Sequence, residues 1–448
     1  MTNYVIILIH YYERKTSAYS LKFYMIKLIA SDMDGTFLNS KHEVPEKNKE
    51  LLNLTNKNNI DFIVATGRAH YEALPALQDA NINCDLICFN GGITYDKNGK
   101  LLDIVPIETK NLYFAIEVFK SLDLSYQLYT KNTVYTNSIE TDIQAYKDLI
   151  ENTGAIADVE KLREDCLRRI EKGHLTEVDN IELHINDEQN PAIKVIAISS
   201  EPEKLKKAYE LLEPHIDIAV TSSGSNNLEI MDKNATKGKA LKKYAKLKNI
   251  SLENTAAFGD NLNDISMLAE VGYGVAMKNG SELTKKTASL VTEKTNDESG
   301  VYYTAKFLIE DNINKTLIEK AIEATKFSYV PYSNFRVGAA LLCETGKIYS
   351  GCNIENASYT PTNCAERTAI FKAVSEGETK FTKIAIVGGI DGNITQYCPP
   401  CGVCRQVISE FADENFEIIL ASSPDDYKVY NFFSEILPLS FSSKDLDK

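Results

Sequence analysis

Three cysteines near the carboxyl end of this 448-residue chain have the spacing of metal ligands. Cys364 precedes one expected helix, and Cys401 and Cys404 stand three residues apart at the start of another. Unpaired N–H groups at a helix start favour thiolate over thiol. Three thiolates can bind Zn²⁺ and leave its fourth position open, as catalytic zinc sites do. Glu366, two residues beyond Cys364, would then lie beside that open position and could exchange protons there.

A second set of reactive side chains is rich in carboxylates. In open α/β sheets, ligands bind beyond the carboxyl ends of the strands. The side chains expected at such strand ends and at the starts of the following helices are Asp32, Asp34, Thr66, Lys237, Asp260 and Asp264. Converging carboxylates repel one another unless a hard cation such as Mg²⁺ lies among them. A nucleophile, a proton donor, cations and a hydroxyl are the groups that phosphoryl transfer needs.

The elements that must position these carboxylates alternate between strand and helix from residue 26 onward. This alternation predicts a Rossmann-like, doubly wound parallel sheet with helices on both faces. Residues 88–195 instead mix hairpin-like pieces with amphipathic helices, which predicts an inserted α+β cap. We therefore expect a core built from residues 25–87 and 196–309, including a strand at 216–220.

The pattern changes near residue 310, and a second domain is expected over residues 312–448. A fresh helix is predicted there, followed by strands and further helices; the predicted ranges are 315–326, 337–343, 347–350, 365–375, 383–387, 403–411 and 416–421. Residues 1–24 form an extension of unknown role. Their short apolar run is too short to span a bilayer, and it lacks the basic lead-in of a signal peptide.

Composition narrows the classes of function. Hydrophobic residues make up 44% of the chain and charged residues 25%, as in water-soluble globular proteins. The 63 acidic residues outnumber the 49 basic ones, for a net charge of -14, so we expect small-molecule substrates and no nucleic-acid or membrane partner. The odd number of cysteines, nine, predicts a reducing, cytoplasmic location.

Four motifs in the amino-terminal part carry a specific resemblance. DMDGT at 32–36, TGR at 66–68, NATKG at 234–238 and GDNLND at 259–264 resemble the Cof-type haloacid-dehalogenase-like phosphatases, over about residues 25–309. By this resemblance, Asp32 would form an aspartyl-phosphate, and Asp34 would protonate the leaving group and then activate water. Thr66 and Lys237 would hold the phosphoryl group. Mg²⁺ would be bound by Asp32, the Asp34 carbonyl and Asp260, with Asp264 in support.

The carboxyl-terminal part closely resembles the small, homotetrameric cytidine deaminases over about residues 312–445. The motifs are FSYVPYSNFRVGAAL at 327–341, NIENASY at 353–359, NCAER at 363–367 and PPCGVCRQ at 399–406. The resemblance implies a three-layer α/β/α domain with a mixed sheet that hydrolyses the 4-amino group of cytidine or deoxycytidine. It also implies a tetramer formed through this domain.

The same resemblance implies a role for each site residue. Cys364, Cys401 and Cys404 would hold Zn²⁺, and Glu366 would carry protons from water to N3 and to the leaving ammonia. Arg367 would donate to a thiolate and offset the excess negative charge of three sulfurs. The remaining residues would contact the substrate: Asn353 and Glu355 the ribose hydroxyls, and Phe335 the pyrimidine.

These observations predict a fused bifunctional hydrolase, which could dephosphorylate a pyrimidine nucleotide and then deaminate the nucleoside. Two alternatives stay open. The amino-terminal part could be a non-catalytic oligomerisation module, or the zinc site could belong to a nucleic-acid base deaminase, although such enzymes need a basic, aromatic-lined channel. A surface or packed role is predicted for each of the six histidines, which are His10, His42, His70, His174, His184 and His215.

Overall fold

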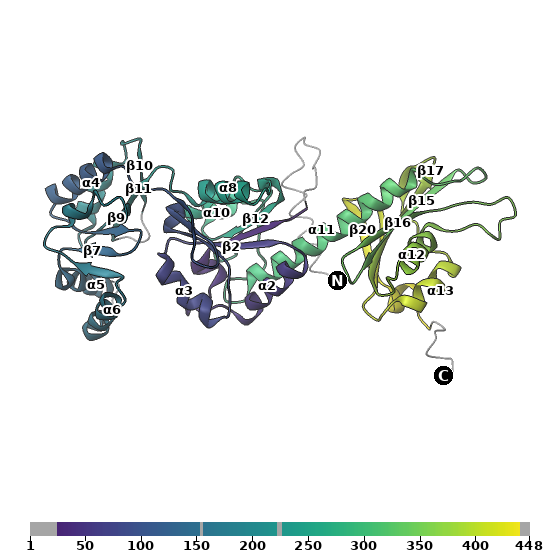
Figure 1. Ribbon diagram of the computed structural model, residues 1–448, viewed down its shortest axis with the longest axis horizontal. Helices are drawn as coiled ribbons and strands as arrows, with labels where there is room; N and C mark the ends of the chain where they lie inside the picture. The colour runs from purple at the N-terminus through teal and green to yellow at the C-terminus, as the bar shows by residue number, and fades with distance from the viewer. Residues whose placement is uncertain (1–24, 153–155, 222–225, 440–448) are drawn as a thin grey trace. The chain divides into compact units, whose positions relative to one another are not determined.

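The polypeptide is described by a computed structural model over residues 25–152, 156–221 and 226–439 (Figure 1). The expected extension at residues 1–24 lies outside the described residues. Contacts divide the chain between residues 305 and 306, inside the helix α11 (Gly300–Thr325). The two resulting units are described separately.

The first unit contains an eight-stranded sheet in the order β14-β13-β12-β1-β2-β3-β4-β5. Neighbouring strands pair in parallel except at one edge, where β4 pairs antiparallel with both β3 and β5. The strand bounds are β1 Leu28–Ser31, β2 Asp61–Ala65, β3 Asp85–Cys88, β4 Ile93–Tyr95, β5 Leu101–Ile104, β12 Thr255–Gly259, β13 Tyr273–Ala276 and β14 Leu290–Val291.

Helices cover both faces of this sheet, with α8 and α10 on one face and α2 and α3 on the other (Figure 1). Their bounds are α2 Glu46–Lys57, α3 His70–Asp79, α8 Lys237–Leu247, α9 Ile265–Leu268 and α10 Glu282–Thr287. Because both faces are covered, the central strands read as apolar runs, and every residue of β1 is buried. The predicted doubly wound sheet is confirmed.

A second sheet in the same unit forms the cap, in the order β10-β11-β9-β6-β7-β8. Its strands are β6 Ser125–Thr130, β7 Val134–Thr136, β8 Leu175–Glu177, β9 Ala192–Ile198, β10 Ile218–Thr221 and β11 Asn227–Asp232. Its helices are α4 Thr109–Ser121, α5 Ile139–Asn152, α6 Val159–Glu171 and α7 Pro202–Leu212.

The expected cap boundaries at residues 88 and 195 are wrong at both ends. The hairpin β4–β5 extends the core sheet, because β4 pairs antiparallel with β3. The strand predicted at 216–220 as part of the core is β10, which joins the cap sheet through β11 and β9. A helix followed by a strand has the same sequence pattern in either sheet, so the pattern does not show which sheet the strand joins.

The second unit contains a mixed sheet in the order β16-β15-β17-β19-β20, with β18 paired to β17. Only β17 and β19 pair in parallel. The elements are β15 Phe335–Cys343, β16 Ile348–Cys352, α12 Ala365–Ser375, β17 Phe381–Ile390, β18 Asn393–Gln396, α13 Gly402–Phe411, β19 Glu417–Ser423 and β20 Asp426–Asn431.

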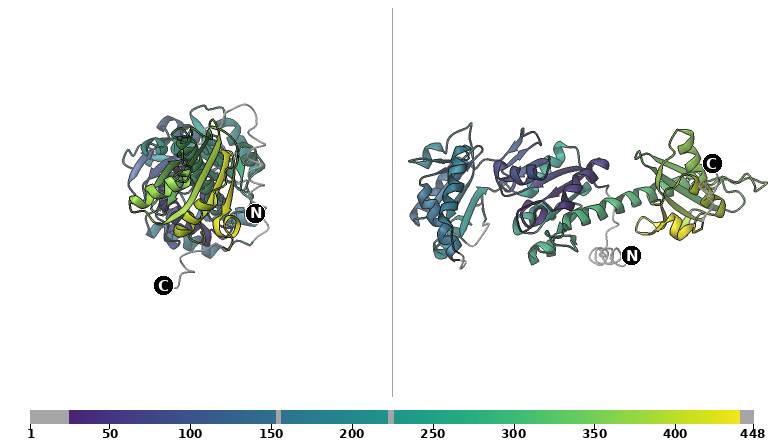
Figure 2. Two further views of the ribbon diagram at one scale, coloured as in Figure 1. Left: turned by 90° about the vertical axis from the view of Figure 1, so that its right-hand side faces the viewer. Right: turned by 90° about the horizontal axis from the view of Figure 1, so that it is seen from below.

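Alternate residues of the strands pack against different helices. Leu341 and Ile386 belong to the cluster that contains α12 and α13 residues. Ala340 and Val387 instead pack with Leu317 and nearby residues of α11. The ribbons show α11 along one side of this sheet and α12 and α13 along the other (Figure 1, Figure 2). The predicted three-layer α/β/α arrangement is therefore confirmed.

The start of the first predicted helix differs clearly from the prediction: α11 begins at Gly300, fifteen positions before the expected start at residue 315. Between residues 301 and 325 the sequence has no glycine or proline that would end a helix. In the part of the chain that the structure describes, no helix is both long enough and apolar enough to cross a membrane.

Candidate active sites

Three cysteine sulfurs meet where the helices α12 and α13 begin. The Sγ of Cys401 lies 3.8 Å from that of Cys364 and 3.5 Å from that of Cys404. Cys364 and Cys401 precede the first turns of α12 and α13, and Cys404 lies within the first turn of α13. Zn–S bonds of about 2.3 Å in a tetrahedron place two sulfurs about 3.8 Å apart. The three sulfurs therefore have the separation that one Zn²⁺ requires.

The ionisation of these thiols also fits a cation. A hydrogen bond with Cys404 lowers the pKa of Cys364 to about 5, and the same contact raises the pKa of Cys404. The contact thus favours one thiolate and one thiol in this pair. Zn²⁺ can replace the proton of that thiol and balance the charge of further thiolates. Among the described residues, the cluster contains no fourth Cys, His, Asp or Glu ligand atom.

Glu366 lies in the first turn of α12 with only 4% of its surface exposed. Burial raises the pKa of its carboxyl group, and the nearby Cys364 thiolate raises it further. The raised pKa lies closer to neutral pH. At a pH near its pKa, a carboxyl group can both accept and return a proton. Glu366 is thus beside the sulfurs without belonging to their ligand group.

Arg367 brings a positive charge to the same cluster. Its Nη2 donates to the Thr362 carbonyl at 2.8 Å and lies 3.8 Å from the Cys364 Sγ. This is the contact with a thiolate that the sequence predicts.

The three residues expected to bind the nucleoside lie on β15 and in the segment after β16. The Glu355 Oε2 accepts hydrogen bonds from the Tyr332 and Ser333 N–H groups at 3.1 and 3.2 Å. Bonds from Ser333 and the backbone lower the pKa of Glu355, which keeps its carboxylate ionised. The Phe335 ring lies against Gly388, where a Cβ would come within 2.9 Å of Cε1.

Asn353 has partners that the sequence did not predict. Its Nδ2 donates to the Phe335 carbonyl at 2.8 Å, and its Oδ1 accepts from the Val337 N–H at 2.9 Å. The amide therefore braces the start of β15. An amide can make further hydrogen bonds at both groups, so this bracing leaves capacity for a ligand.

In the first unit, Lys237 joins two predicted carboxylates. It opens α8, is fully buried, and its Nζ lies 2.5 Å from Asp32 Oδ1 and 2.7 Å from Asp264 Oδ1. Burial and the nearby Asp264 charge raise the pKa of Asp32 well above its usual range. One lysine therefore leaves these acidic groups incompletely balanced.

Asp260 completes the carboxylate cluster. Its Oδ1 accepts a hydrogen bond from the Thr36 hydroxyl at 2.7 Å, and burial raises its pKa. Carboxylate oxygens of Asp32, Asp260 and Asp264 all lie within 4.8 Å of one another. Oxygen donors with excess negative charge suit Mg²⁺, so the residues fit the implied metal.

Both carboxylate oxygens of Asp264 accept hydrogen bonds from groups of the protein. Its Oδ1 accepts from Lys237, and its Oδ2 accepts from the N–H groups of Asp260 and Asn261, both at 2.9 Å. These bonds hold the loop that carries Asp260.

The Asp34 side chain points to a different group of residues. The guanidinium of Arg68 donates to both of its oxygens, with Nε 2.8 Å from Oδ2, and His42 Nδ1 lies 3.3 Å from Oδ1. The sequence predicted no catalytic or binding role for either partner, although Arg68 ends the TGR motif. The His42 side chain is 71% exposed, as expected for a surface histidine, but its position beside Asp34 gave no sequence signal.

Thr66 follows β2 and is buried, with its Oγ1 accepting from the Arg68 N–H at 3.1 Å. Its carbonyl accepts from the Asn90 N–H at 2.9 Å, and the Asn90 Oδ1 accepts from Asn263 Nδ2 at 2.9 Å. Asn90 and Asn263 line a cavity of about 710 Å³ together with Asp32 and Asp34. The reasoning from sequence missed both asparagines; the Asn-Gly-Gly run at 90–92 signals only a turn.

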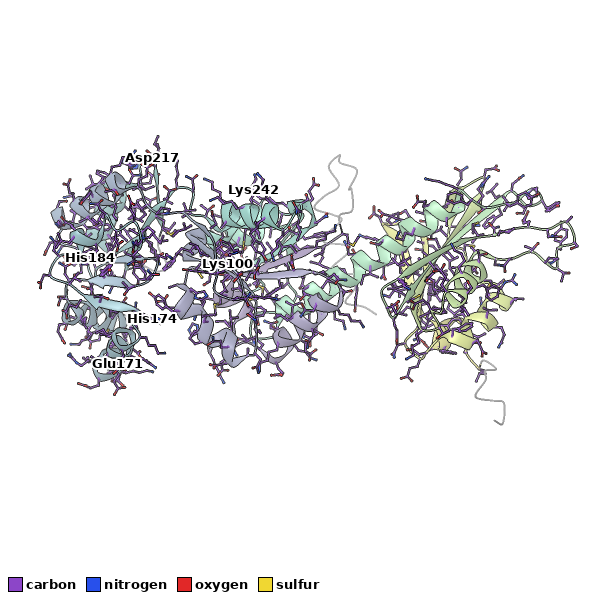
Figure 3. The ribbon with its side chains drawn as sticks, in the orientation of Figure 1. Lys100, Glu171, His174, His184, Asp217 and Lys242 are labelled. Atoms are coloured by element: carbon purple, nitrogen blue, oxygen red, sulfur yellow. The ribbon has the colours of Figure 1, made fainter. Side chains whose placement is uncertain are left out.

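Two other histidines take packed positions in the cap. His174 stacks on Tyr71 with ring centroids 4.0 Å apart, and His184 stacks on Tyr135 at 4.1 Å. Both histidines are labelled in Figure 3. This agrees with the packed role predicted from the absence of ligand spacing.

Comparisons with known proteins find relatives of both parts. The family model of the haloacid dehalogenase-like hydrolases matches residues 29–304, and that of the cytidine and deoxycytidylate deaminase zinc-binding region matches residues 311–420. The phosphatase YwpJ of Bacillus subtilis is 34% identical over 286 residues, which are 63% of this chain and 100% of that protein.

A cytidine deaminase of Sporosarcina psychrophila is 48% identical over 130 residues, or 29% of this chain and 92% of that enzyme. Among solved structures, a haloacid dehalogenase-like hydrolase from B. subtilis aligns with a TM-score of 0.53 and 33% identity, covering 63% of this chain and 99% of the other. The chain therefore belongs to the haloacid dehalogenase-like hydrolases through its amino-terminal part and to the cytidine deaminases through its carboxyl-terminal part, as a fusion of two enzymes.

Proposed function

We propose that the carboxyl-terminal domain is a zinc-dependent enzyme that hydrolyses cytidine and deoxycytidine to uridine and deoxyuridine. The observation that carries this proposal is the cluster of Cys364, Cys401 and Cys404 sulfurs with the buried Glu366 beside it. Bound there, Zn²⁺ would supply a nucleophile near neutral pH by lowering the pKa of water.

The chain's own residues would bind the nucleoside and move its protons. Glu366 would accept a proton from water and give it to N3 of the pyrimidine. It would then take the proton of the new hydroxyl at C4 and give it to the amino group, which leaves as ammonia while C4 becomes a carbonyl. The ionised Glu355 would accept a hydrogen bond from a ribose hydroxyl, and the amide of Asn353 would donate one to a ribose hydroxyl. Phe335 offers an aromatic surface to the pyrimidine. Polar groups of this kind discriminate strongly between ligands with and without the hydroxyl, because a ligand that lacks it leaves them unpaired.

Spectroscopic assay of the full chain tests this proposal. Wild type should convert cytidine to uridine, and Glu366→Gln should lose activity by about 10²- to 10⁴-fold while keeping its zinc. Glu410→Gln, at an exposed glutamate of α13, is the matched control and should retain full activity. Retained deamination in Glu366→Gln would contradict the proposal.

We propose that the amino-terminal domain is a magnesium-dependent phosphatase acting on a small phosphorylated metabolite. Mg²⁺ held near Asp32, the Asp34 carbonyl and Asp260 would neutralise charge on the phosphoryl group. Asp32 would attack phosphorus and release the alcohol, to which Asp34 gives a proton. Asp34 would then take a proton from the water that hydrolyses the aspartyl-phosphate. Thr66 and Lys237 would hold the phosphoryl oxygens.

Phosphate release from p-nitrophenyl phosphate distinguishes this function from a non-catalytic module. Wild type with Mg²⁺ should be active, and Asp32→Asn should not be. Asp79→Asn, at the exposed end of α3, is the matched control. Absence of phosphate release from wild type, with this ester and with a panel of phosphorylated metabolites, would favour the non-catalytic module.

We also propose that the two activities can act in sequence on a pyrimidine nucleotide, and that the deaminase domain forms a homotetramer. Supplying CMP to the purified chain should yield cytidine and then uridine, and the mass in solution should equal four chains. Absence of both nucleosides would remove the first hypothesis, and a monomeric mass would remove the second.

A further inference from the structure

The cavity at the phosphatase site is bounded by both the core and the cap. Its volume is about 710 Å³, which is in the range of small-ligand sites. Asp32, Asp34 and Arg68 line it from the core, and Thr221 and Glu229 line it from the cap strands β10 and β11. A phosphate ester that reacts at Asp32 would therefore extend its alcohol part along these cap residues.

Glu229 is the charged group on the cap side of this cavity. It is 5% exposed, and its Oε2 accepts a hydrogen bond from Lys194 Nζ at 3.2 Å. Lys194 is equally buried and lies 4.8 Å from the centroid of the Tyr129 ring and 5.7 Å from that of Phe89. The lysine is thus fixed from several sides. Within the described ranges, Glu229 Oε1 has no hydrogen-bond partner.

This buried ion pair is not needed to form the cap sheet. The neighbouring Ile230 points to the opposite face and packs in the apolar core with α4 and α7. A buried ion pair seldom stabilises a fold more than apolar side chains of the same size would. A carboxylate held at the cavity wall is better explained by a ligand than by folding.

We propose that Glu229, oriented by Lys194, is a specificity-determining residue that accepts a hydrogen bond from a hydroxyl of the leaving alcohol. This inference rests on the proposed phosphatase function. Because Lys194 already balances the charge of Glu229, the carboxylate does not require a cationic ligand. It remains a strong acceptor, so the substrate class is a phosphate ester whose alcohol part carries at least one further hydroxyl.

Matched esters that differ by one hydroxyl test the proposal in the full chain with Mg²⁺. Suitable pairs are ribose 5-phosphate with 2-deoxyribose 5-phosphate, glucose 6-phosphate with 2-deoxyglucose 6-phosphate, and glycerol 3-phosphate with propyl phosphate. p-Nitrophenyl phosphate, which has no alcoholic hydroxyl, reports whether the site is intact. The variants are Glu229→Gln and Glu229→Ala, with Glu203→Gln at an exposed position of α7 as control.

Wild type and Glu203→Gln should favour the hydroxylated member of at least one pair by about tenfold or more in kcat/KM. Glu229→Ala should lose this preference, and Glu229→Gln should weaken it, while both hydrolyse p-nitrophenyl phosphate at the wild-type rate. The inference is overturned if wild type favours no hydroxylated ester, if the preference survives in Glu229→Ala, or if p-nitrophenyl phosphate hydrolysis falls equally. If wild type hydrolyses no ester at all, the proposed phosphatase function itself fails.

Discussion

At the scale of single residues, both sites gather acidic groups around one positive side chain. Lys237 lies between Asp32 and Asp264, and Arg367 lies beside Cys364. In each case one cation does not balance all the nearby acidic groups. The excess negative charge that remains favours the binding of a divalent cation.

Arg367→Ala should weaken zinc binding, because it removes the positive charge 3.8 Å from the Cys364 sulfur. We expect a loss of about tenfold in affinity, the size of one charge-assisted hydrogen bond. Competition with a chromogenic chelator measures this directly. Arg367→Lys, which keeps the charge, should lose less. Unchanged zinc affinity in Arg367→Ala would show that the guanidinium does not act on the thiolate.

Asp142 in the cap predicts a dependence of stability on pH. Its carboxyl group accepts from Gln127 Nε2 at 2.7 Å, and burial raises its pKa. A carboxyl whose pKa is higher in the folded chain does not lower the free energy of unfolding while it is protonated in both states. As the pH rises above the pKa of the unfolded chain, the free energy of unfolding begins to fall, and the loss is complete once the pH exceeds the pKa of the folded chain.

Asp142→Asn should therefore gain stability relative to wild type as the pH rises. Thermal unfolding at pH 4 and pH 8 measures the difference in melting temperature between the two proteins. That difference should favour the variant more at pH 8. An equal difference at the two pH values would indicate that burial does not perturb this carboxyl group.

At the scale of elements, the turn after β1 places Asp32 and Asp34 in different surroundings. Gly35 in this turn has a φ of 74°, and a Cβ there would lie 2.6 Å from Asp260 Oδ2. The glycine thus permits both the left-handed backbone and the close approach of Asp260.

Gly35→Ala should lower phosphatase kcat/KM by at least about tenfold, because the new methyl group displaces Asp260. Gly99→Ala is the matched control: its φ is 78°, but nothing lies within 4 Å of the new Cβ. Both variants carry a backbone strain of about 1–2 kcal/mol, and only the first should lose activity. Equal activity of the two variants would show that Gly35 is not required to position Asp260.

The sequence predicts these elements well where the signal is local. Apolar runs identify β1 and β2, and the ligand spacing places Cys401 and Cys404 on one helical turn. The contacts of Asp34 with Arg68 and His42 join residues that are distant along the chain or exposed, so no periodic pattern reveals them. The cap boundary fails for a related reason, because β10 could pair with either sheet.

At the scale of the whole molecule, the chain carries two candidate sites built from different residues, for which we propose different metals. Each lies within one of the two units that contacts define. The family matches divide the chain at nearly the same place, at residues 304 and 311.

Each activity should therefore survive loss of the other. Asp32→Asn should abolish phosphate release and leave cytidine deamination unchanged, and a zinc-selective chelator should do the reverse when Mg²⁺ is in excess. Parallel assays of one preparation measure both. Loss of both activities in either experiment would mean that the units depend on one another for folding or catalysis.

Our proposal for the deaminase domain requires that one Zn²⁺, held by Cys364, Cys401 and Cys404, supports deamination through Glu366. The most direct measurement adds Zn²⁺ stepwise to metal-stripped protein and follows the loss of cytidine absorbance. We predict a deamination rate that rises with bound zinc and saturates at one ion per chain. Full activity in the stripped protein, or saturation with zinc bound but no uridine formed, would contradict the claim.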